Sequence, residues 1–199
     1  MKPNSRQPLS GLQSHWCDKV IAYDGSQLRA HWLLDRFALV GDALVAFRGP
    51  CNVARNEVAD LEDLDGPGIA ADDMVHFIWE SFANTDLLLA THRQRLFAAQ
   101  VREVVQQLAP SSDVTRIGDD LYVANGKLSI SIATVTPVSA LMHFAVNAKP
   151  GGAPVAIASL SELGIEPSML AHAVLARVVA EQDSIAAARA KVRAKGEWR

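Results

Sequence analysis

Apolar and polar positions in the first half of the chain follow two different periods, and these predict interleaved helices and strands. Apolar residues at near-helical spacing predict helices over residues 27–39, 72–82 and 97–108. Short apolar runs between turn-forming residues predict strands over residues 19–23, 43–47 and 86–90. Residues 48–52 are expected to form a loop, and the acidic, turn-rich residues 54–71 a surface excursion.

From residue 113 to residue 148 the pattern changes to short β-prone segments separated by turns. Asn125 and Gly126 lie between two of these segments, and this pair strongly favours a hairpin turn. We therefore predict an antiparallel meander with strands at residues 114–117, 121–124, 128–136 and 141–148.

The C-terminal part of the chain predicts one long helix. Pro167 suits a helix start, and residues 168–195 are rich in alanine and contain no helix breaker. The apolar stripe thins after Asp183. We expect the last turns to stand in solvent or to contact a partner, including a second copy of the chain in a homo-oligomer.

The order of these elements predicts an α+β fold, in which helices pack on a mixed, mainly antiparallel sheet. A length of 199 residues suits one domain. Residues 1–15 are polar and contain two prolines, so we expect a flexible leader there. Residues 16–199 are then expected to form a single α+β domain that ends in the long helix.

Composition narrows the class of protein. The chain is 49% hydrophobic and 21% charged, which is typical of globular proteins. A net charge of −3 gives no strong signal for nucleic-acid binding. The chain has no secretory signal and no run of about 18 apolar residues, so we expect a cytoplasmic protein without a membrane span. Neither the two cysteines nor the six histidines follow a metal-ligand spacing, so no metal site is predicted.

The stretch with the clearest chemical signal covers residues 116–130. Asp119 and Asp120 stand at the start of a predicted strand, and the hairpin turn returns one cation, Lys127, on the next strand. Because cross-strand neighbours lie about 5 Å apart, Asp120 and Lys127 can share one small site. A lysine there could neutralise a carboxylate or a phosphate while charge develops in a transition state. The alternative is an ordinary surface ion pair, which contributes under about 1 kcal/mol.

This stretch resembles the hairpin of the biotin and lipoate protein ligases, in which a basic residue, an Asn-Asp pair and a glycine turn precede a lysine. Arg116 matches the basic residue, and Asp120 and Lys127 match the aspartate and the lysine. Asp119 stands where that family has asparagine. The resemblance implies a ligase-like fold, related to class II synthetases. It also implies that the lysine holds the substrate carboxylate and the α-phosphate of an acyl-adenylate.

Two further stretches resemble the same superfamily, in a consistent order along the chain. His143 and Asn147 match the His-Gly-x-Ala-x-Asn strand of the octanoyltransferases. Residues 46–57, with Arg48 and Asn52, resemble a Gly-Arg-x-Gln-Asn segment of the ligases. By this resemblance the four residues are candidate ligand contacts. The whole chain looks closest to an uncharacterised archaeal and bacterial family with a ligase-like fold, which brings no activity with it.

The chain departs from the ligases at the loop that closes over their substrate and phosphates. The family's Arg-Arg-x-Ser-Gly-Gly-Gly loop has no copy here, and residues 91–95 supply basic charge without glycines. His92, Arg93 and Arg95 are candidate anion ligands through charge-assisted hydrogen bonds, with a solvated face as the alternative for His92. The catalytic cysteine of the octanoyltransferases is also missing, so acyl transfer through that cysteine is not expected.

Three other side chains leave alternatives open. Cys51 follows a Gly-Pro pair, where a nucleophile with His92 or His143 as its base is conceivable, but a spectator thiol is the simpler interpretation. His76 lies among apolar residues of a predicted helix, which favours a histidine buried in the core. His143 alternates with apolar neighbours on a predicted strand, so it points outward or into a cleft if they are buried.

Together these observations predict a ligase-like domain that binds a small carboxylic acid or a nucleotide in a cleft over its sheet. In a catalytic version, ATP with Mg²⁺ would activate the carboxylate while Lys127 stabilises the charge. Asp120 would orient the lysine or hold the magnesium ion, and Arg48, Arg93 and Arg95 would contact phosphates. The alternatives are a binding module that keeps the fold without the chemistry, and a protein that joins partners through its C-terminal helix.

Overall fold

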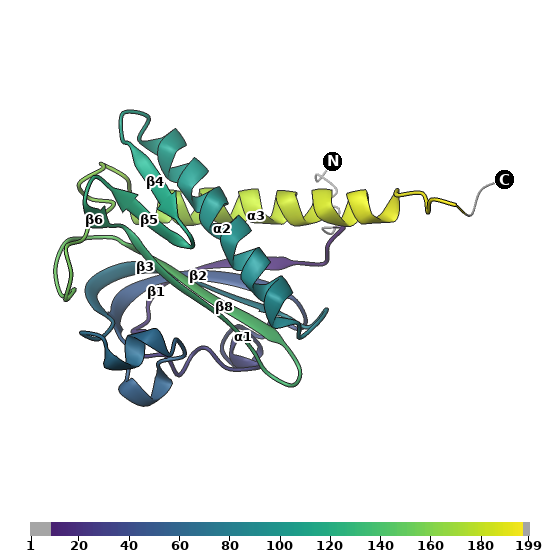
Figure 1. Ribbon diagram of the computed structural model, residues 1–199, viewed down its shortest axis with the longest axis horizontal. Helices are drawn as coiled ribbons and strands as arrows, with labels where there is room; N and C mark the ends of the chain where they lie inside the picture. Colours follow the sequence, from purple (N-terminus) through teal and green to yellow (C-terminus); the bar gives the residue numbers. More distant parts are fainter. Residues whose placement is uncertain (1–8, 197–199) are drawn as a thin grey trace.

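The computed structural model describes residues 9–196, which form two β-sheets and three α-helices (Figure 1). In chain order the elements are β1 (Gln13–Val20), α1 (Trp32–Phe37), β2 (Ala43–Asn52), β3 (Ala70–Ser81), α2 (Leu87–Leu108), β4 (Val114–Ile117), β5 (Asp120–Val123), β6 (Gly126–Lys127), β7 (Ser129–Val135), β8 (Ala140–Asn147) and α3 (Pro167–Ala190). Two short 3₁₀ helices, η1 (Arg55–Glu57) and η2 (Glu62–Asp65), lie between β2 and β3. Within residues 9–196, no helix combines the length and the apolarity that crossing a bilayer requires.

The main sheet has five strands in the order β1-β2-β3-β8-β7. Its β1–β2 pair is parallel, and its other three strand pairs are antiparallel. A smaller antiparallel sheet contains β4, β5 and β6, with the predicted hairpin turn between β5 and β6. The predicted α+β fold with a mainly antiparallel sheet is therefore confirmed.

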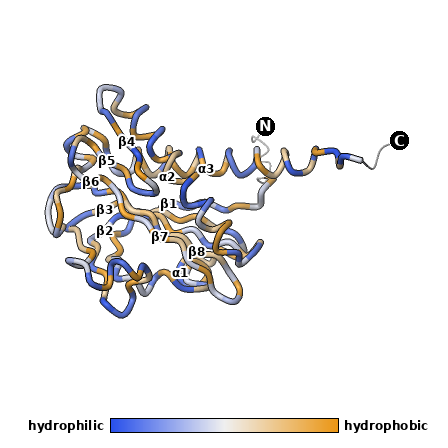
Figure 2. The backbone as a smooth tube through the Cα atoms, viewed as in Figure 1, coloured by the Kyte–Doolittle hydropathy of each residue, from blue (hydrophilic) through white to orange (hydrophobic). Residues whose placement is uncertain are grey.

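Both faces of the main sheet are covered. Helices α2 and α3 lie on one face, and α1 and the 3₁₀ segment lie on the other (Figure 1). Phe77, Phe97 and Phe144 pack together in the apolar cluster beneath α2 and α3. Phe47 and Ile78 belong to a second cluster on the opposite face. Figure 2 accordingly shows apolar residues concentrated on the central strands and hydrophilic ones on the outer loops.

The helix predicted over residues 72–82 is wrong, because these residues form most of β3. Every residue from Met74 to Ser81 is buried, since this central strand is covered on both faces. A strand buried on both faces has no polar side, so its sequence is a nearly continuous apolar run. Periodicity alone does not distinguish such a run from a buried helix. His76 is buried as expected, but on this strand.

The strand predicted over residues 86–90 is also wrong, because residues 87–89 form the first turn of α2. The Asp86 side chain caps this helix by accepting a hydrogen bond from the Leu89 backbone N–H at 2.7 Å. The leucine side chains at positions 87–89 are exposed rather than covered by a neighbouring layer. The capping aspartate, rather than the apolar run, is the signal that identifies this segment.

The N-terminal region differs from the prediction as well. Residues 1–8 of the expected leader lie outside the described residues, but β1 already begins at Gln13, which pairs with Ala43. The strand ends at Val20 instead of extending over residues 19–23. Most of β1 is exposed along the edge of the sheet, so its sequence lacks the alternation of a half-buried strand. The expected loop at residues 48–52 is the second half of β2, and α1 is shorter than predicted.

Helix α3 begins at Pro167 as predicted and ends at Ala190, before the expected residue 195. Its first half packs against the sheet and α2, whereas its second half extends beyond the sheet (Figure 1). Both the backbone N–H and the hydroxyl of Ser10 donate to Asp183, at 2.9 and 2.7 Å. This contact ties the start of the described chain to the far half of α3. A role for this helix in joining copies of the chain stays a prediction.

Candidate ligand-binding site

A cavity of about 550 Å³ lies against the sheet face opposite α2 and α3. Strands β3, β7 and β8 contribute its floor, and the segment between β2 and β3 and residues 153–157 contribute its walls. Met74, Ile130, Ile132 and Val155 give its middle an apolar lining. A cavity of this size suits a small organic molecule.

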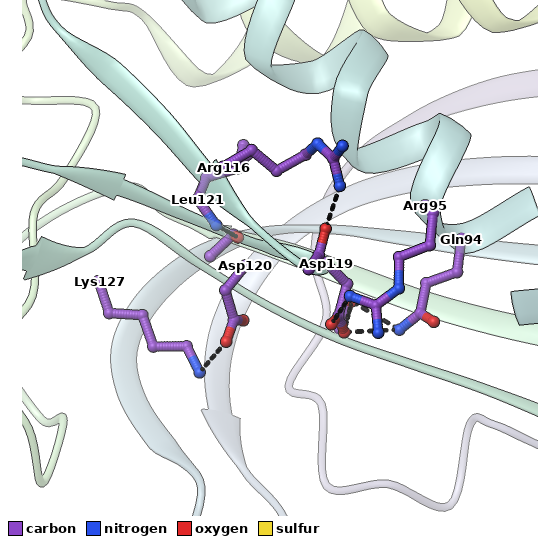
Figure 3. A network of polar contacts seen from close by, with 10 residues as sticks. Gln94, Arg95, Arg116, Asp119, Asp120, Leu121 and Lys127 are labelled. Atoms are coloured by element: carbon purple, nitrogen blue, oxygen red, sulfur yellow. Dashed lines mark hydrogen bonds and ion pairs between the residues drawn. The ribbon is translucent and has the colours of Figure 1, made fainter. Parts of the chain in front are cut away.

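Lys127 and Asp120 form an ion pair in this cavity (Figure 3). The Lys127 Nζ atom lies 2.8 Å from Asp120 Oδ2, and the two side chains are 30% and 24% exposed. Burial raises the pKa of Asp120 in spite of the nearby ammonium group. Burial also opposes the charge on Lys127, but the hydrogen bond to Asp120 and the negative charges nearby, including those of Asp120 and Asp63, together outweigh it and raise the lysine pKa. The lysine is therefore charged and available to an anionic ligand.

Asp119 joins three parts of the fold (Figure 3). Gln94 Nε2 and Ser131 Oγ donate to its Oδ2 at 2.7 and 2.6 Å, and the Arg95 guanidinium donates to its Oδ1. Gly118, directly before it, has a φ of +65°, and a Cβ at that position would run into the Arg95 side chain. The Asp119 carboxylate is therefore occupied in connecting α2, β7 and the start of β5.

We expect Asp119→Asn to lower the free energy of unfolding by about 2 kcal/mol. The asparagine amide keeps one acceptor oxygen, and its NH₂ group would face a donor that the carboxylate now accepts. Urea unfolding would measure the loss, with Asp113→Asn, on an exposed aspartate of the same region, as the control. An unchanged unfolding free energy for Asp119→Asn would mean that the amide satisfies the same three donors.

Tyr23, His143 and His76 form a second polar group at the cavity. The Tyr23 ring stacks on the His143 ring with 3.8 Å between centroids and 9° between planes. His143 Nε2 lies 3.0 Å from His76 Nδ1, and His76 Nε2 lies 3.1 Å from the carbonyl oxygen of Gly49. Because a carbonyl only accepts, His76 donates through Nε2 and accepts through Nδ1. His143 therefore donates through Nε2, which leaves its Nδ1 as an acceptor.

Burial keeps this group uncharged. It lowers the pKa of His76 to about 4, and burial together with His76 lowers the pKa of His143 well below its ordinary value. Burial also raises the pKa of Tyr23, and the nearby Glu57 carboxylate adds to the effect. At neutral pH both imidazoles are neutral and the phenol keeps its proton.

Asn147 holds the backbone of Lys127 in place. It lies four residues beyond His143 on the same face of β8. Its Nδ2 donates to the carbonyl oxygens of Lys127 at 3.0 Å and of Ala158 at 3.2 Å. Asn147 therefore braces the end of the hairpin against the segment that closes one wall of the cavity.

Six of the candidate residues from the sequence line the cavity, namely Asp119, Asp120, Lys127, Arg95, His143 and Asn147. The other five do not. Arg48 is held by a bidentate ion pair with Asp73, with Nε 2.8 Å from Oδ1. Arg93 stacks over the Trp79 ring at 5.0 Å, next to β8 on the helix-covered face.

Arg116, Asn52 and His92 are the remaining candidates outside the cavity lining. Arg116 is exposed, and its guanidinium donates to the backbone oxygen of Gly118 (Figure 3). Asn52 is an exposed residue at the end of β2, and His92 is exposed on α2. Of the expected phosphate ligands, Arg95 alone reaches the cavity wall within the described residues, and it already binds Asp119.

Tyr23 and a group of four acidic residues, here called the acidic wall, line the cavity although no sequence pattern indicated them. The four acidic residues are Glu57, Asp60, Glu62 and Asp63. These residues belong to the segment 54–71, for which the sequence predicts a surface excursion. Nothing in that pattern indicates that the segment folds back over the sheet. Cys51, the conceivable nucleophile, is 2% exposed outside the cavity lining, and burial raises the pKa of its thiol to about 12. This environment is unfavourable for a nucleophile.

Comparison with protein families and curated proteins identifies relatives without an assigned function. The model of a family described as a domain of unknown function, DUF366, matches residues 12–193. An uncharacterized protein of Methanocaldococcus jannaschii is 34% identical over 150 residues, which are 72% of this chain and 67% of that protein.

Solved structures confirm the ligase-like fold that the sequence predicted. A protein of unknown function from Pyrococcus horikoshi is similar with a TM-score of 0.87 and 41% identity, over 92% of this chain and 98% of that one. A biotin protein ligase from Aquifex aeolicus, in complex with biotin and ATP, gives a TM-score of 0.57 at 12% identity, over 86% and 70% of the two chains. A biotin protein ligase from Leishmania major gives 0.56 at 11% identity, over 94% and 83%. At these identities the ligases indicate the fold alone.

Proposed function

The chain belongs to the DUF366 family, whose function is unknown, and from this premise we propose that its cavity binds a small carboxylic acid through Lys127. The observation that carries the proposal is a charged, partly buried lysine at a cavity of about 550 Å³. The lysine ammonium has three N–H donors and uses one on Asp120, so donors remain for a ligand carboxylate. The apolar middle of the cavity suits the carbon skeleton of such an acid.

The residues present do not fit the triphosphate of ATP. Of the three expected phosphate ligands, Arg48 and Arg93 are engaged with Asp73 and Trp79, and Arg95 is paired with Asp119. The lining also carries the carboxylates of the acidic wall, which repel the several negative charges of a triphosphate more strongly than the single charge of a carboxylate. The glycine loop of the ligases is missing from the sequence, so no backbone cradle replaces the arginines. Binding of an acid without ATP chemistry is therefore our first proposal.

Acyl-adenylate formation from ATP is the second candidate function. One observation favours it. Asp120 and Lys127, which match the aspartate and the lysine of the ligase hairpin, form an ion pair at 2.8 Å. In that function the lysine would hold the carboxylate near the site of reaction. A cytoplasmic location, as expected from the sequence, would supply ATP.

Direct binding measurements test the first proposal. Isothermal titration with lipoate, octanoate, biotin and a series of shorter acids should give saturable binding for at least one acid. The corresponding primary amides serve as matched controls, because they lack the charge that Lys127 would hold. Equal binding of an acid and its amide, or no binding of any acid, would contradict the proposal.

AMP release from ATP tests the second candidate. The purified protein would be incubated with ATP, Mg²⁺ and each acid of the panel. AMP release that depends on the acid would establish an adenylating enzyme. Acid binding without AMP release would leave the binding protein as the function.

A further inference from the structure

The group formed by Tyr23, His143 and His76 has hydrogen-bonding capacity that the protein itself does not use. Tyr23 is 3% exposed and His143 is 2% exposed, and both line the cavity. Within residues 9–196, the Tyr23 hydroxyl and the His143 Nδ1 atom have no hydrogen-bond partner. Neither atom is fully enclosed, so both remain open to the cavity, where a ligand group can supply the partners that the protein does not.

The tautomer of His143 defines the kind of ligand group that fits. The chain of hydrogen bonds from the Gly49 carbonyl through His76 makes His143 Nδ1 an acceptor. A ligand atom that meets Nδ1 must therefore carry an N–H or O–H donor. His143 lies on a buried strand, and its Nε2 is held by His76. Its ring therefore keeps this tautomer, and Nδ1 does not become a donor for a ligand acceptor.

The charges at this part of the cavity favour a cationic donor. Glu57 lies close enough to Tyr23 to raise its pKa, and Gly25 packs directly against the Glu57 side chain. None of the four acidic wall residues forms an ion pair within the part of the chain that the structure describes. Glu57, the wall residue beside Tyr23, would stabilise a positive charge near the His143 acceptor, whereas Asp63 acts on Lys127.

The two polar groups lie at different positions along one strand. His143 and Asn147 are four residues apart on β8, which corresponds to about 13 Å, and Asn147 binds the backbone of Lys127. Between them on the same face of β8 is Ala145, and its partner on β7, Ile130, lines the cavity at this level. The cavity therefore offers an anion site and a cation-donor site on either side of an apolar middle.

We propose that the ligand is a zwitterion, a carboxylic acid that carries a protonated amine several carbon atoms away from its carboxylate. The amine donates to His143 Nδ1 and the Tyr23 hydroxyl and lies near Glu57, while Lys127 holds the carboxylate. This assignment rests on the proposed function, because the carboxylate end is the acid site proposed above. It adds the chemical class of the group at the other end of the ligand, which is a protonated amine.

Matched ligands test this assignment. Isothermal titration would compare ω-amino acids of increasing chain length with the fatty acids and the alkylamines of the same lengths. We expect one ω-amino acid to bind about tenfold more tightly than either matched compound, because the second charged contact contributes to its affinity alone. Glu57→Gln and Tyr23→Phe should each remove most of this preference. Asp65→Asn, in the same segment but outside the cavity lining, should retain it.

The outcomes separate the two proposals. Fatty acids that bind as tightly as ω-amino acids, or a preference unchanged in Glu57→Gln, would overturn the zwitterion while leaving the carboxylate site intact. Alkylamines that bind as tightly as the ω-amino acids would overturn the role of Lys127 and with it the proposed function. Because Glu57 is exposed and Tyr23→Phe keeps the stacked ring, both variants are expected to fold.

Discussion

Lys127→Met is expected to weaken binding of carboxylic acids by about 10- to 150-fold. The variant keeps the length and apolar stem of the side chain but removes the ammonium group that would hold the carboxylate. A charge-assisted hydrogen bond in a partly buried site contributes about 1.5–3 kcal/mol, which corresponds to this loss. Isothermal titration with the tightest acid of the panel would measure it.

Two further variants make the Lys127→Met result specific. Removing the lysine alone leaves Asp120 partly buried without its cation, so stability is expected to fall with affinity. The double variant Lys127→Met/Asp120→Asn removes both charges and should recover stability without recovering binding. Lys149→Met, on an exposed lysine beyond β8, is the control for a general loss of charge. Acid binding that survives in the double variant would show that Lys127 is not the anchor.

Acidification from pH 6.5 to pH 4 is expected to destabilise the protein by about 3 kcal/mol through His76 alone. Burial lowers the pKa of His76 in the folded protein to about 4, whereas a histidine in the unfolded chain titrates near 6.5. Between these two values the unfolded state binds a proton that the folded state does not. The stability contributed by the neutral imidazole is therefore complete above pH 6.5 and is lost as the pH falls through this window. His143, whose pKa is also lowered, acts in the same direction.

Histidine NMR separates this effect from the titration of carboxylates. The ring signals of His76 and His143 should stay in the neutral form at pH 5.5, with one fixed tautomer. Urea unfolding across the same pH range would measure the loss of stability, and His92→Gln should leave that curve unchanged. Ordinary titration of His76 and His143 near pH 6.5 would contradict both the burial and the hydrogen-bond chain proposed for them.

The hairpin with Asp120 and Lys127 was predictable because its determinants are local. A turn pair and two short β-prone segments specify which strand returns the lysine. Tyr122 is the direct cross-strand partner of Lys127, and Asp120, two residues before Tyr122 on β5, is a diagonal neighbour within reach of the long lysine side chain. His143 was also identifiable as a residue that faces away from its apolar neighbours. What it faces depends on segments more than a hundred residues earlier in the chain, such as Tyr23, and no local pattern contains that information.

The segments predicted wrongly have other physical causes. Residues 72–82 are buried on both faces of the sheet, so their pattern contains no polar period that would identify a strand. The leucines at 87–89 are apolar residues on an exposed helix turn, where burial does not explain the sequence. At residues 72–82 the tertiary environment, rather than local propensity, determines the secondary structure, whereas at residues 87–89 the local cap by Asp86 identifies the helix start. The positions of Arg48 and Arg93 likewise depend on tertiary contacts that the local sequence does not show. Arg48 pairs with Asp73, and Arg93 stacks over the Trp79 ring.

The pairing of β3 with β8 at the centre of the main sheet has a consequence for the order of folding. Met74 pairs with Asn147, so this contact closes a long stretch of chain that includes α2 and the whole small sheet. Contacts between residues so far apart in sequence form slowly, because the entropy lost in closing the chain precedes any gain from pairing. During synthesis, β1 and β2 emerge together and can pair early, but His143 and Asn147 reach the cavity floor only after most of the chain has been made. The candidate site is therefore completed only when β8 joins the sheet, so we expect a ligand to stabilise the last step of folding rather than the first.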